Sequence, residues 1–504
     1  MKSRQLRSRA RCEMDALMQQ SVTLLGDLVD GLTADQAAVP VAGIALDSRQ
    51  LRPGEVFLAV AGHVNDGRDF IDAAVARGAA AIIAEAPCDA SQWRLPVVVV
   101  DRLGERVSEI AGRFYQHPSR RLKVIGVTGT NGKSSVTHYI AQMLDALAQP
   151  CGVIGTLGAG RVNQLSGALN TTPDAISIQS TLGQWRDAGA KWAAMEVSSH
   201  GLSQHRVAAL QFSTAVFTNL SQDHLDYHGT MAEYGAAKAR LFTMSGLQHA
   251  VLNADDLFTE ELRKVCASPS LLTFGLSADA DVCASEIKYL AEGISARIQT
   301  PWGELQLFTA LIGIVNLKNV LAAIAVLGVE GFSVEQIEQA LKVLKPVPGR
   351  LEKLQSVGGV QVIIDYAHSP DALEQVLTSL RPHCQRRLWC VFGCGGNRDK
   401  SKRPLMAAVA ERLADVLIVT TDNPRDEAPE VIAGDIRKGL TKDGYRIELD
   451  RQRAIELAVG EASAGDLIVI AGKGHEDYQE WRGQRLPFSD VHCARLALAG
   501  RQSS

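Results

Sequence analysis

The sequence predicts an α/β protein built of three domains. At 504 residues the chain is longer than a single hydrophobic core supports, so about three domains of ordinary size are expected. Short apolar runs typical of buried strands alternate with amphipathic helical stretches, which is the pattern of α/β units. We place the domains at residues 20–121, 122–346 and 347–504, after a basic tail, residues 1–19, that we expect to be disordered.

The first segment alternates short apolar runs with helical stretches, as an α/β domain does. Its strand-like runs are Ile44–Leu46, Val56–Val60, Ala81–Ile83 and Val97–Val100. His117-Pro118-Ser119 predicts a hinge at the end of this segment, because proline interrupts regular structure.

The stretch from Gly126 to Ser135 is the most informative in the chain, and it reads GVTGTNGKSS. An apolar run, Lys123–Val127, enters it, and a run with helical spacing leaves it. Strand, glycine loop and helix are the arrangement that a phosphate-binding loop requires. The usual pattern has four residues between its glycines, whereas Gly126 and Gly132 enclose five. The central segment is therefore predicted to be a P-loop ATPase-like α/β domain.

The residue types of this loop suit a nucleotide triphosphate. Glycines let backbone N–H groups approach phosphates, and the N-terminus of the following helix adds partial positive charge. Lys133 can reach the β and γ oxygens, and Ser134 can ligate Mg²⁺.

A carboxylate ends another strand-like run of the central segment. Glu196 lies near the end of Trp192–Val197, where it suits a second magnesium ligand opposite Ser134. Ser198 or Ser199 capping a helix explains the same cluster equally well.

Two histidines and two carboxylates lie within residues 223–228. They could serve a metal or form a capped polar loop, and Mg²⁺ prefers oxygen ligands. Lys238 follows in the helical stretch Met231–Phe242, where composition alone gives it no role.

The last segment follows the linker Lys345–Gly349 and alternates strand and helix clearly. Its strand-like runs are Gln361–Ile364, Leu388–Phe392, Val416–Thr420 and Leu467–Ala471. Each is followed by a polar cluster, at residues 365–368, 393–398, 422–425 and 472–476. Turn chemistry explains the glycines of these clusters but not their repeated Arg, His and Glu. Because ligands bind at the carboxyl ends of parallel strands, we predict a Rossmann-like domain with a binding site at this edge.

Composition excludes several classes of function. A net charge of −4 argues against a general nucleic-acid binder, and no apolar run reaches the ~18 residues of a membrane span. The nine cysteines include no CxxC pair, which predicts a reduced, cytoplasmic protein. We expect small molecules as its partners.

Several motifs, taken together and in this order, resemble the Mur ligase family from about residue 44 to 494. They are Gly129–Ser134, Glu196–Gly201, Thr218–Leu220, Asp223–His228, Gly313 with Asn316 and Asn319, Pro348–Arg350, and Asp365–Asp371. Each motif alone is common, whereas their joint occurrence is specific to the family.

The resemblance implies an ATP-dependent ligase that joins a carboxylate to an amine through an acyl phosphate. Within the family the chain is most similar to the members that extend UDP-N-acetylmuramoyl-L-alanyl-D-glutamate in peptidoglycan precursor synthesis. Asp422-Asn423-Pro424-Arg425 resembles the signature of those that add meso-2,6-diaminopimelate, and members that add L-lysine depart from it. A cytoplasmic monomer is the expectation.

By the same resemblance, specific residues take specific roles. The expected catalytic residues are Lys133, His224 and Lys238, the last modified by CO₂ to N6-carboxylysine. The expected magnesium ligands are Ser134, Glu196, His224 and the Lys238 carbamate. The expected ATP contacts are Gly129, Thr130, Asn131, Gly132, Lys133, Ser134, Ser135, Asn316, Arg350 and Asp365.

Two further sets bind the other substrates by resemblance. The UDP-sugar-peptide contacts are Leu46, Ser48, His63, Val64, Asn65, Thr171, Thr172, Ser198, Gln204 and Arg206. The diaminopimelate contacts are Arg398, Asp422, Asn423, Pro424, Arg425, Gly472 and Glu476. A guanidinium at Arg425 suits the distal carboxylate that lysine lacks, and a surface ion pair with Asp422 or Asp426 is the alternative.

Other functions stay open on the sequence alone. A lysine-adding sibling and a folylpolyglutamate synthase-like ligase share the phosphate loop and differ in the amine or acceptor that they use. A P-loop nucleotide switch would hydrolyse ATP without an amine, and a degenerate sugar-nucleotide binder would not turn over at all.

Overall fold

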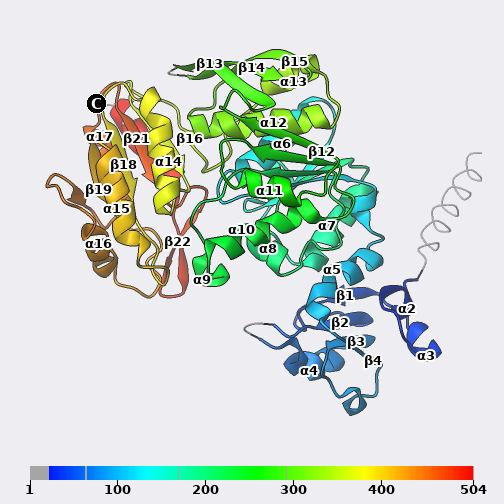
Figure 1. Ribbon diagram of the computed structural model, residues 1–504. Coiled ribbons are helices and arrows are strands. Elements are labelled where there is room, and N and C mark those ends of the chain that lie inside the picture. Colours follow the sequence, from blue (N-terminus) through cyan, green and yellow to red (C-terminus); the bar gives the residue numbers. More distant parts are fainter. Residues whose placement is uncertain (1–21, 63–64, 168–169, 291, 503–504) are drawn as a thin grey trace, which may run out of the picture. The chain divides into compact units, whose positions relative to one another are not determined.

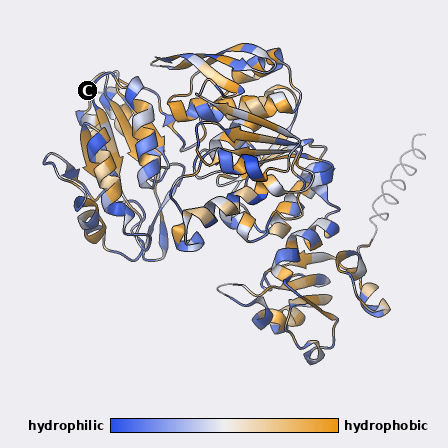
Figure 2. Ribbon diagram, in the orientation of Figure 1, coloured by the Kyte–Doolittle hydropathy of each residue, from blue (hydrophilic) through white to orange (hydrophobic). Residues whose placement is uncertain are grey.

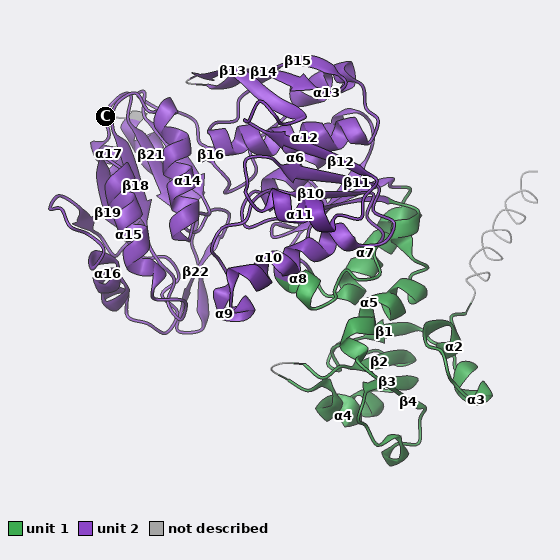
Figure 3. Ribbon diagram, viewed as in Figure 1, with its two compact units in different colours: residues 1–122, 173–189, 200–210 green, residues 123–172, 190–199, 211–504 purple. Residues whose placement is uncertain are grey.

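The computed structural model describes residues 22–62, 65–167, 170–290 and 292–502 (Figure 1). The basic tail, residues 1–19, lies outside the described residues, as do His63 and Val64. The chain divides into two compact units (Figure 3). Unit 1 comprises residues 1–122, 173–189 and 200–210, and unit 2 comprises residues 123–172, 190–199 and 211–504. The three-domain boundaries at 20–121, 122–346 and 347–504 stay a prediction.

Unit 1 contains a four-stranded parallel sheet in the order β1-β2-β3-β4. The strands are β1 (Gly43–Ala45), β2 (Glu55–Ala59), β3 (Ala81–Glu85) and β4 (Val97–Val100). Along β2, Val56 and Leu58 belong to one apolar cluster while Phe57 and Ala59 belong to another. Both faces of the sheet are therefore covered, as the continuous apolar runs predict.

Helices cover this sheet and complete the unit. They are α2 (Leu25–Leu28), α3 (Ala34–Ala37), α4 (Ile71–Ala76), α5 (Leu103–Phe114) and α7 (Ala175–Asp187). α5 and α7 pack against each other, so a segment far along the chain joins the first domain's core.

The first part of unit 2 is built on an eleven-stranded sheet in the order β15-β14-β13-β12-β11-β10-β5-β9-β6-β7-β8. Its inner parallel strands are β6 (Cys151–Gly155), β9 (Trp192–Glu196), β5 (Lys123–Thr128), β10 (Thr214–Phe217), β11 (His249–Asn253) and β12 (Ser270–Gly275). Val127 lies opposite Glu196 and Thr128 lies opposite Phe217 in the ladders that flank β5. This register brings the ends of β5, β9 and β10 to one edge.

Two helices cover this sheet, and antiparallel strands extend it at its edge. α6 (Lys133–Ala146) and α12 (Ile314–Val329) pack together on it, and α12 is buried on nearly all sides. The extension is β13 (Val282–Leu290), β14 (Gly293–Thr300) and β15 (Gly303–Thr309), packed on α13 (Val334–Leu341). β7 (Gly158–Arg161) and β8 (Gln164–Ser166) extend the opposite edge. α10 (Met231–Ala239) and the 3₁₀ turn Arg240–Thr243 form the helical stretch that carries Lys238.

The second part of unit 2 is a six-stranded sheet in the order β16-β17-β21-β18-β19-β20. Its strands are β16 (Glu352–Lys353), β17 (Gln361–Asp365), β21 (Leu467–Ala471), β18 (Leu388–Phe392), β19 (Val416–Val419) and β20 (Arg446–Ile447). Two separate apolar clusters fill its faces, one with α14 (Pro370–Leu380), α15 (Lys402–Leu413) and α16 (Pro429–Arg437), the other with α17 (Arg451–Glu461) and α18 (Asp490–Gln502). The central strands are parallel and apolar (Figure 2), which confirms the doubly wound arrangement.

A small hairpin follows the last central strand. β22 (Tyr478–Trp481) pairs with β23 (Gln484–Pro487), and Arg425 bridges to Trp481 of this hairpin. The hairpin thus adjoins the loop after β19, where the Asp422–Arg425 motif lies.

Candidate functional site

The phosphate-loop motif adopts the expected strand, loop and helix. It leaves β5 at Thr128 and enters α6 at Lys133, with φ of 144° at Gly129 and 86° at Gly132. A Cβ at Gly129 would lie 1.9 Å from Thr218 Oγ1, so only glycine fits there. Thr218 Oγ1 and Asn219 Nδ2 both donate to Asn131 O. The loop after β10 therefore supports the phosphate loop.

Two lysine ammonium groups meet at one carbonyl oxygen of this loop. Lys133 Nζ donates to Gly129 O at 2.9 Å and to Thr130 O at 2.8 Å, and Lys238 Nζ donates to Gly129 O at 2.9 Å. Burial lowers the pKa of Lys238 well below its ordinary value, and the charge of Lys133 lowers it further. Burial also lowers the pKa of Lys133, opposed by Glu196. An anion, or conversion of one lysine to an anion, would relieve this repulsion.

Glu196 lies at the end of β9, buried, with both carboxylate oxygens engaged. Thr156 donates to them through its backbone N at 2.9 Å and its hydroxyl at 3.1 Å. A Cβ at Gly155 would lie 2.2 Å from Glu196 Oε1, so the strand must carry glycine to admit the carboxylate. Thr156 Oγ1 lies 3.1 Å from Thr171 Oγ1, and because the one Thr156 hydroxyl proton goes to Glu196, Thr171 is the donor to Thr156.

The capping alternative for the Glu196 cluster concerns the residues just after it. α8 (Ser199–Ser203) begins there, and Ser199 Oγ lies 2.9 Å from His228 Nε2. Thr172 Oγ1 donates to Glu196 O and accepts from Ser198 N, both at 2.9 Å. The carboxylate of Glu196 takes no part in these bonds, because Thr156 holds it instead.

Asp223 and His224 lie in the loop before α9 (Leu225–His228). His224 has φ of 54°, and its Nε2 is 3.5 Å from Asp223 Oδ2. Burial alone raises the pKa of Asp223, but His224, His368 and Lys133 outweigh it, so the pKa is lowered. Burial lowers the pKa of His224 despite the nearby Asp223 carboxylate. A neutral imidazole can act as a metal ligand.

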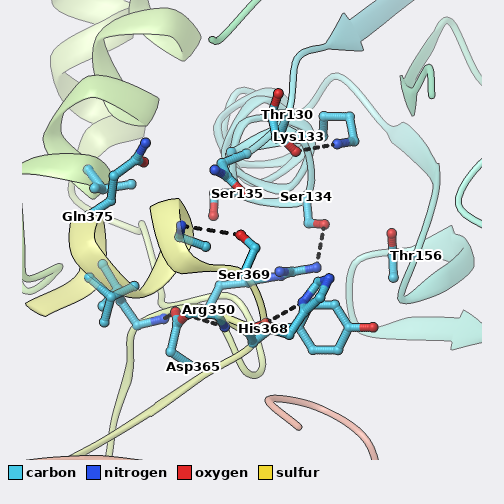
Figure 4. A pocket seen from close by; sticks show the side chains of 18 of the residues that line it. Thr130, Lys133, Ser134, Ser135, Thr156, Arg350, Asp365, His368, Ser369 and Gln375 are labelled. Atoms are coloured by element: carbon cyan, nitrogen blue, oxygen red, sulfur yellow. Dashed lines mark hydrogen bonds between the residues drawn. The ribbon is translucent and has the colours of Figure 1, made fainter. Parts of the chain in front are cut away.

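Arg350, just before β16, reaches the phosphate loop, and Asp365, at the end of β17, supports it (Figure 4). Arg350 Nη2 is 3.4 Å from Ser134 Oγ, and its guanidinium stacks 4.4 Å from the centre of the Tyr366 ring. Asp365 accepts the backbone N–H of Leu351 and of Ala367, each at 2.8 Å. Burial raises the pKa of Asp365. Asp365 thus fixes the turn that presents Arg350.

Asn316, on α12, uses its amide largely within the protein. Tyr139 Oη donates to Asn316 Oδ1 at 2.9 Å, and Asn316 Nδ2 donates to Ile312 O at 3.0 Å. One amide N–H and one oxygen lone pair stay available toward the neighbouring cavity.

These groups line one cavity of about 250 Å³ in unit 2. The walls contain the phosphate loop, Glu196, the Asp223-His224 pair, Asn316, Arg350 with Leu351, and residues 365–369. In Figure 4 the Arg350 side chain extends to Ser134, while the Lys133 ammonium bonds back to its own loop. Of the residues assigned to ATP and metal, Gly129 and Lys238 do not line it; Lys238 Nζ donates to Gly129 O. Among the described residues, no three His, Cys, Asp or Glu side chains form a metal cluster.

A second polar cluster lies at the carboxyl ends of β19 and β21. Asn423 Nδ2 donates to Glu476 Oε2 at 2.9 Å, and Asp422 Oδ1 accepts the Asn423 backbone N–H at 2.7 Å. A Cβ at Gly472 would lie 2.5 Å from Asp422 Oδ2. The buried Arg451 holds both strand ends, since it donates to Thr421 O and Ala471 O at 2.9 Å.

Arg425 has a different partner from the two that the sequence alternative named. Its Nε donates to Glu480 Oε2 at 3.0 Å, rather than to Asp422 or Asp426, and its Nη1 donates to Gly396 O at 2.8 Å. Glu480 lies on β22, 55 residues away, so adjacency in sequence could not identify it. The guanidinium keeps Nη2 and part of Nη1 for another partner. Arg398 is exposed in the loop after β18.

The residues assigned to the UDP-sugar-peptide are divided between the units. Leu46, Ser48 and Asn65 belong to unit 1, where Ser48 is buried and Asn65 is exposed. Gln204 and Arg206 also belong to unit 1, and Arg206 Nε donates to Gln204 Oε1 at 3.0 Å. Thr171, Thr172 and Ser198 belong to unit 2, beside Glu196. Their binding roles stay predictions.

Sequence models of known families match all three parts of the chain. The Mur ligase family catalytic domain matches residues 40–115, the Mur ligase middle domain matches 127–327, and the Mur ligase glutamate ligase domain matches 349–474. The chain belongs to the Mur ligase family. As a Mur ligase it is an ATP-dependent enzyme that forms amide bonds.

Named relatives of this Mur ligase are similar over nearly their full length. A UDP-N-acetylmuramoyl-L-alanyl-D-glutamate--2,6-diaminopimelate ligase of Ectopseudomonas mendocina is 50% identical over 477 residues, which is 94% of this chain and 98% of that protein. The ligase of that name from Pseudomonas aeruginosa is 49% identical over 465 residues, 90% of this chain and 94% of that protein. A solved structure of a ligase of that name has a TM-score of 0.73 and 36% identity, and covers 96% of this chain and 100% of that one.

Sequence reasoning missed three residues that the geometry brings to these sites. Thr156 holds Glu196, Glu480 holds Arg425, and Lys473 Nζ donates to Glu476 Oε2 at 2.9 Å. Lys473 lies within a polar cluster that the sequence singled out, so its place at a strand end was the available signal.

Within the described ranges of this Mur ligase, no helix is both long and apolar enough to cross a lipid bilayer.

Proposed function

We propose that this Mur ligase adds meso-2,6-diaminopimelate to UDP-N-acetylmuramoyl-L-alanyl-D-glutamate, using ATP, in peptidoglycan precursor synthesis. The relatives that carry this name match at 49–50% identity over at least 90% of the chain. The observation that carries the proposal is that Lys133, Glu196, His224 and Arg350 line one cavity together. It places cations and a carboxylate around a space where a triphosphate and a second anion could meet.

The chemistry requires two anions to approach each other. The D-glutamate side-chain carboxylate attacks the γ-phosphorus of ATP, the bond from that phosphorus to the β,γ-bridging oxygen breaks, and ADP leaves. The amine then attacks the acyl carbon of the acyl phosphate, loses a proton, and inorganic phosphate leaves. Lys133 and Arg350 neutralise charge on the phosphates, and the backbone N–H groups of the loop orient them.

The donor set fits Mg²⁺, the expected cofactor. Ser134 Oγ and the Glu196 carboxylate are oxygen ligands on the same cavity wall, and carboxylate oxygens keep lone pairs beyond the two that Thr156 uses. When bound, Mg²⁺ would offset the negative charge of the triphosphate. His224 would hold a second ion together with a modified Lys238.

Lys238 is suited to carbamylation. Only a neutral amine attacks CO₂: its lone pair forms the N–C bond and the amine loses a proton, which gives an anionic carbamate. The lowered pKa of the buried Lys238 favours the neutral form, and the neighbouring Lys133 ammonium would pair with the product. This change converts a repulsive lysine pair into an attractive one.

The second polar cluster suits the amino-acid substrate. Diaminopimelate carries an ammonium and a carboxylate at its distal centre, whereas lysine has only the ammonium. Arg425 would bind that carboxylate and Glu476 would bind that ammonium, with Asp422, Asn423, Pro424, Gly472 and Arg398 nearby. This pairing favours diaminopimelate over the lysine-adding alternative.

We also propose a cytoplasmic location, because ATP and UDP-linked precursors are cytoplasmic, and we keep the expectation of a monomer. In this role the enzyme supports cell-wall biogenesis, and through it cell shape and division.

The test is phosphate release with UDP-N-acetylmuramoyl-L-alanyl-D-glutamate, ATP and one amino acid at a time. We expect release with meso-2,6-diaminopimelate and little with L-lysine. Release with folate and glutamate, or ATP hydrolysis that needs no amine, would instead support the folylpolyglutamate synthase-like or nucleotide-switch alternatives.

A further inference from the structure

A fully buried lysine contacts two of the residues that we propose bind the amino-acid substrate, Asn423 and Glu476. Lys473 follows β21, and its side chain is 0% exposed. Its ammonium donates to Asn423 Oδ1 at 3.0 Å and to Glu476 Oε2 at 2.9 Å, and it lies 5.4 Å from the centre of the Tyr478 ring. A buried ammonium costs free energy unless it is paired, and both of its carbonyl or carboxylate partners are pocket residues.

The first consequence concerns the orientation of the Asn423 amide. Asn423 Oδ1 accepts from Lys473 Nζ and also from the backbone N of Glu480, at 2.9 Å. Two donors fill the two lone pairs of this oxygen. The amide nitrogen must then lie on the side of Glu476: one N–H donates to Glu476 Oε2, and among the described residues the other has no hydrogen-bond acceptor.

The second consequence concerns Glu476. Its Oε2 accepts from both Lys473 and Asn423, while among the described residues no hydrogen bond to its Oε1 is formed. The Glu476 side chain is 16% exposed, so Oε1 has access to a bound molecule. The ion pair with Lys473 fixes which oxygen is free.

We propose that Lys473 is the positioning residue that sets the specificity of this pocket for an amino acid whose distal centre carries both an ammonium and a carboxylate. It does so by turning an amide N–H of Asn423 toward the substrate carboxylate and one oxygen of Glu476 toward the substrate ammonium. Without the lysine ammonium, the Asn423 oxygen keeps only the backbone N–H of Glu480 as a donor, so the amide is held less firmly, and Glu476 loses its counter-charge. This inference rests on the proposed function and names the residue that orients its specificity site.

The test compares Lys473→Met with the matched control Lys438→Met in the intact enzyme. Lys438 also pairs with an acid three residues away, Asp435, but its side chain is 71% exposed. For Lys473→Met we expect the KM for meso-2,6-diaminopimelate to rise roughly ten- to a hundredfold, as when one or two hydrogen bonds to charged groups are lost. The KM values for ATP and the UDP-linked substrate should stay within about twofold, and the preference for diaminopimelate over L-lysine should fall. Lys438→Met should match the wild type.

An equal change in all three KM values would mean a structural role only and would overturn the proposal, as would an unchanged KM for diaminopimelate. A double-mutant cycle adds a second criterion. In a Glu476→Gln background, Lys473→Met should raise the KM for diaminopimelate by less than it does alone, because the two side chains act as a pair. If the two substitutions raise the KM independently, so that their effects simply multiply, the proposal is contradicted.

If Lys473→Met does not fold, Asn423→Asp tests the same orientation with the lysine in place. Its second oxygen would replace the N–H that faces the pocket, so the KM for diaminopimelate should again rise selectively. An unchanged KM would overturn the proposal.

Wild-type turnover separates the role of Lys473 from the proposed function. If the wild-type enzyme releases no phosphate with diaminopimelate, the proposed function is wrong. If the wild type is active and the variants have unaltered kinetics, only the role of Lys473 is wrong.

Discussion

At the scale of single residues, the two lysines that share Gly129 O repel each other electrostatically within the nucleotide site. Lys133 and Lys238 each approach this oxygen to 2.9 Å, and because Lys238 is buried, water screens its charge poorly. The surrounding protein therefore favours a neutral or negatively charged Lys238. Arg425 is a comparable case, since Glu480 and Gly396 orient it while part of its donor set stays available.

Replacing Lys238 by alanine should remove ligase activity by at least about a hundredfold while the protein stays folded, because a positioned charge opposite the triphosphate is lost. Acetate at high concentration should restore part of the activity by supplying a carboxylate in the vacated space. Steady-state phosphate release with and without acetate measures both effects. Lys264→Ala, which removes an exposed lysine that pairs with Glu261, is the control. Full activity of Lys238→Ala would refute the carbamate role.

Arg425→Ala should lose activity with meso-2,6-diaminopimelate by roughly a thousandfold in kcat/KM, because the substrate carboxylate is left without its cation. ATP affinity, measured by equilibrium binding, should be retained. The control Arg446→Ala removes an exposed arginine that pairs with Glu461 outside the pocket. Unchanged diaminopimelate kinetics in Arg425→Ala would refute its role in specificity.

At the scale of secondary-structure elements, the site exists because parallel strands end together. β5, β9 and β10 deliver the phosphate loop, Glu196 and the Thr218 loop to one edge of the first large sheet of unit 2. In the second sheet, β17 and β21 are paired with Asp365 opposite Ala471, which aligns the loops that follow. Arg451 then ties the loop after β19 to the end of β21 and to Asp490 on α18.

Arg451→Met should lower the free energy of unfolding by about 3–5 kcal/mol, because Asp490 would stay buried without its partner. Both side chains of this pair are 0% exposed, so solvent screening does not reduce the effect. Denaturant titration measures it. The exposed ion pair between Arg446 and Glu461 gives the comparison. Arg446→Met should lower the free energy of unfolding by no more than about 1 kcal/mol. Equal losses in the two variants would show that burial does not strengthen the Arg451 pair.

The sequence predicted those strands and helices whose pattern of apolar residues is strong. Buried parallel strands read as uninterrupted apolar runs, so Val97–Val100, Leu388–Phe392 and Leu467–Ala471 were found with their observed bounds. The antiparallel strands β13–β15 and the β22–β23 hairpin were not predicted. β15 alternates exposed and buried residues and was overlooked, whereas every residue of β23 is exposed, so this strand has no buried face to reveal it. Contacts distant in sequence, such as Arg425 with Glu480, depend on that hairpin and were missed with it.

At the scale of the whole molecule, several histidines are held neutral by burial. His138 lies inside α6, 2% exposed, and burial together with the charge of Arg350 lowers its pKa to about 4. His383 lies between Leu290 O and the backbone N of Gly313, each at 3.0 Å, which requires a neutral ring that donates through Nδ1 and accepts through Nε2. The folded state therefore binds protons less readily than the unfolded chain.

Stability should fall as the pH drops from about 7 to about 4. The unfolded chain binds a proton at His138 near its ordinary pKa of 6.5, whereas the folded protein does so only near 4. This group's stabilising contribution is present above pH 6.5 and is lost through that window, at most about 3 kcal/mol. Denaturant titrations at several pH values measure it. His138→Leu should flatten the dependence, while His492→Leu, at an exposed position, should leave it unchanged; an equally steep curve for His138→Leu would rule this group out.

The central claim is that one enzyme activates the glutamyl carboxylate with ATP and then accepts only an amine donor with a zwitterionic far end. It is tested most directly by one incubation with ATP, UDP-N-acetylmuramoyl-L-alanyl-D-glutamate and equal concentrations of meso-2,6-diaminopimelate and L-lysine, with the products resolved by mass spectrometry. We expect the diaminopimelate product to exceed the lysine product by roughly a thousandfold, with one phosphate released per product. Comparable amounts of both products, a predominant lysine product, or phosphate without either product would contradict the account.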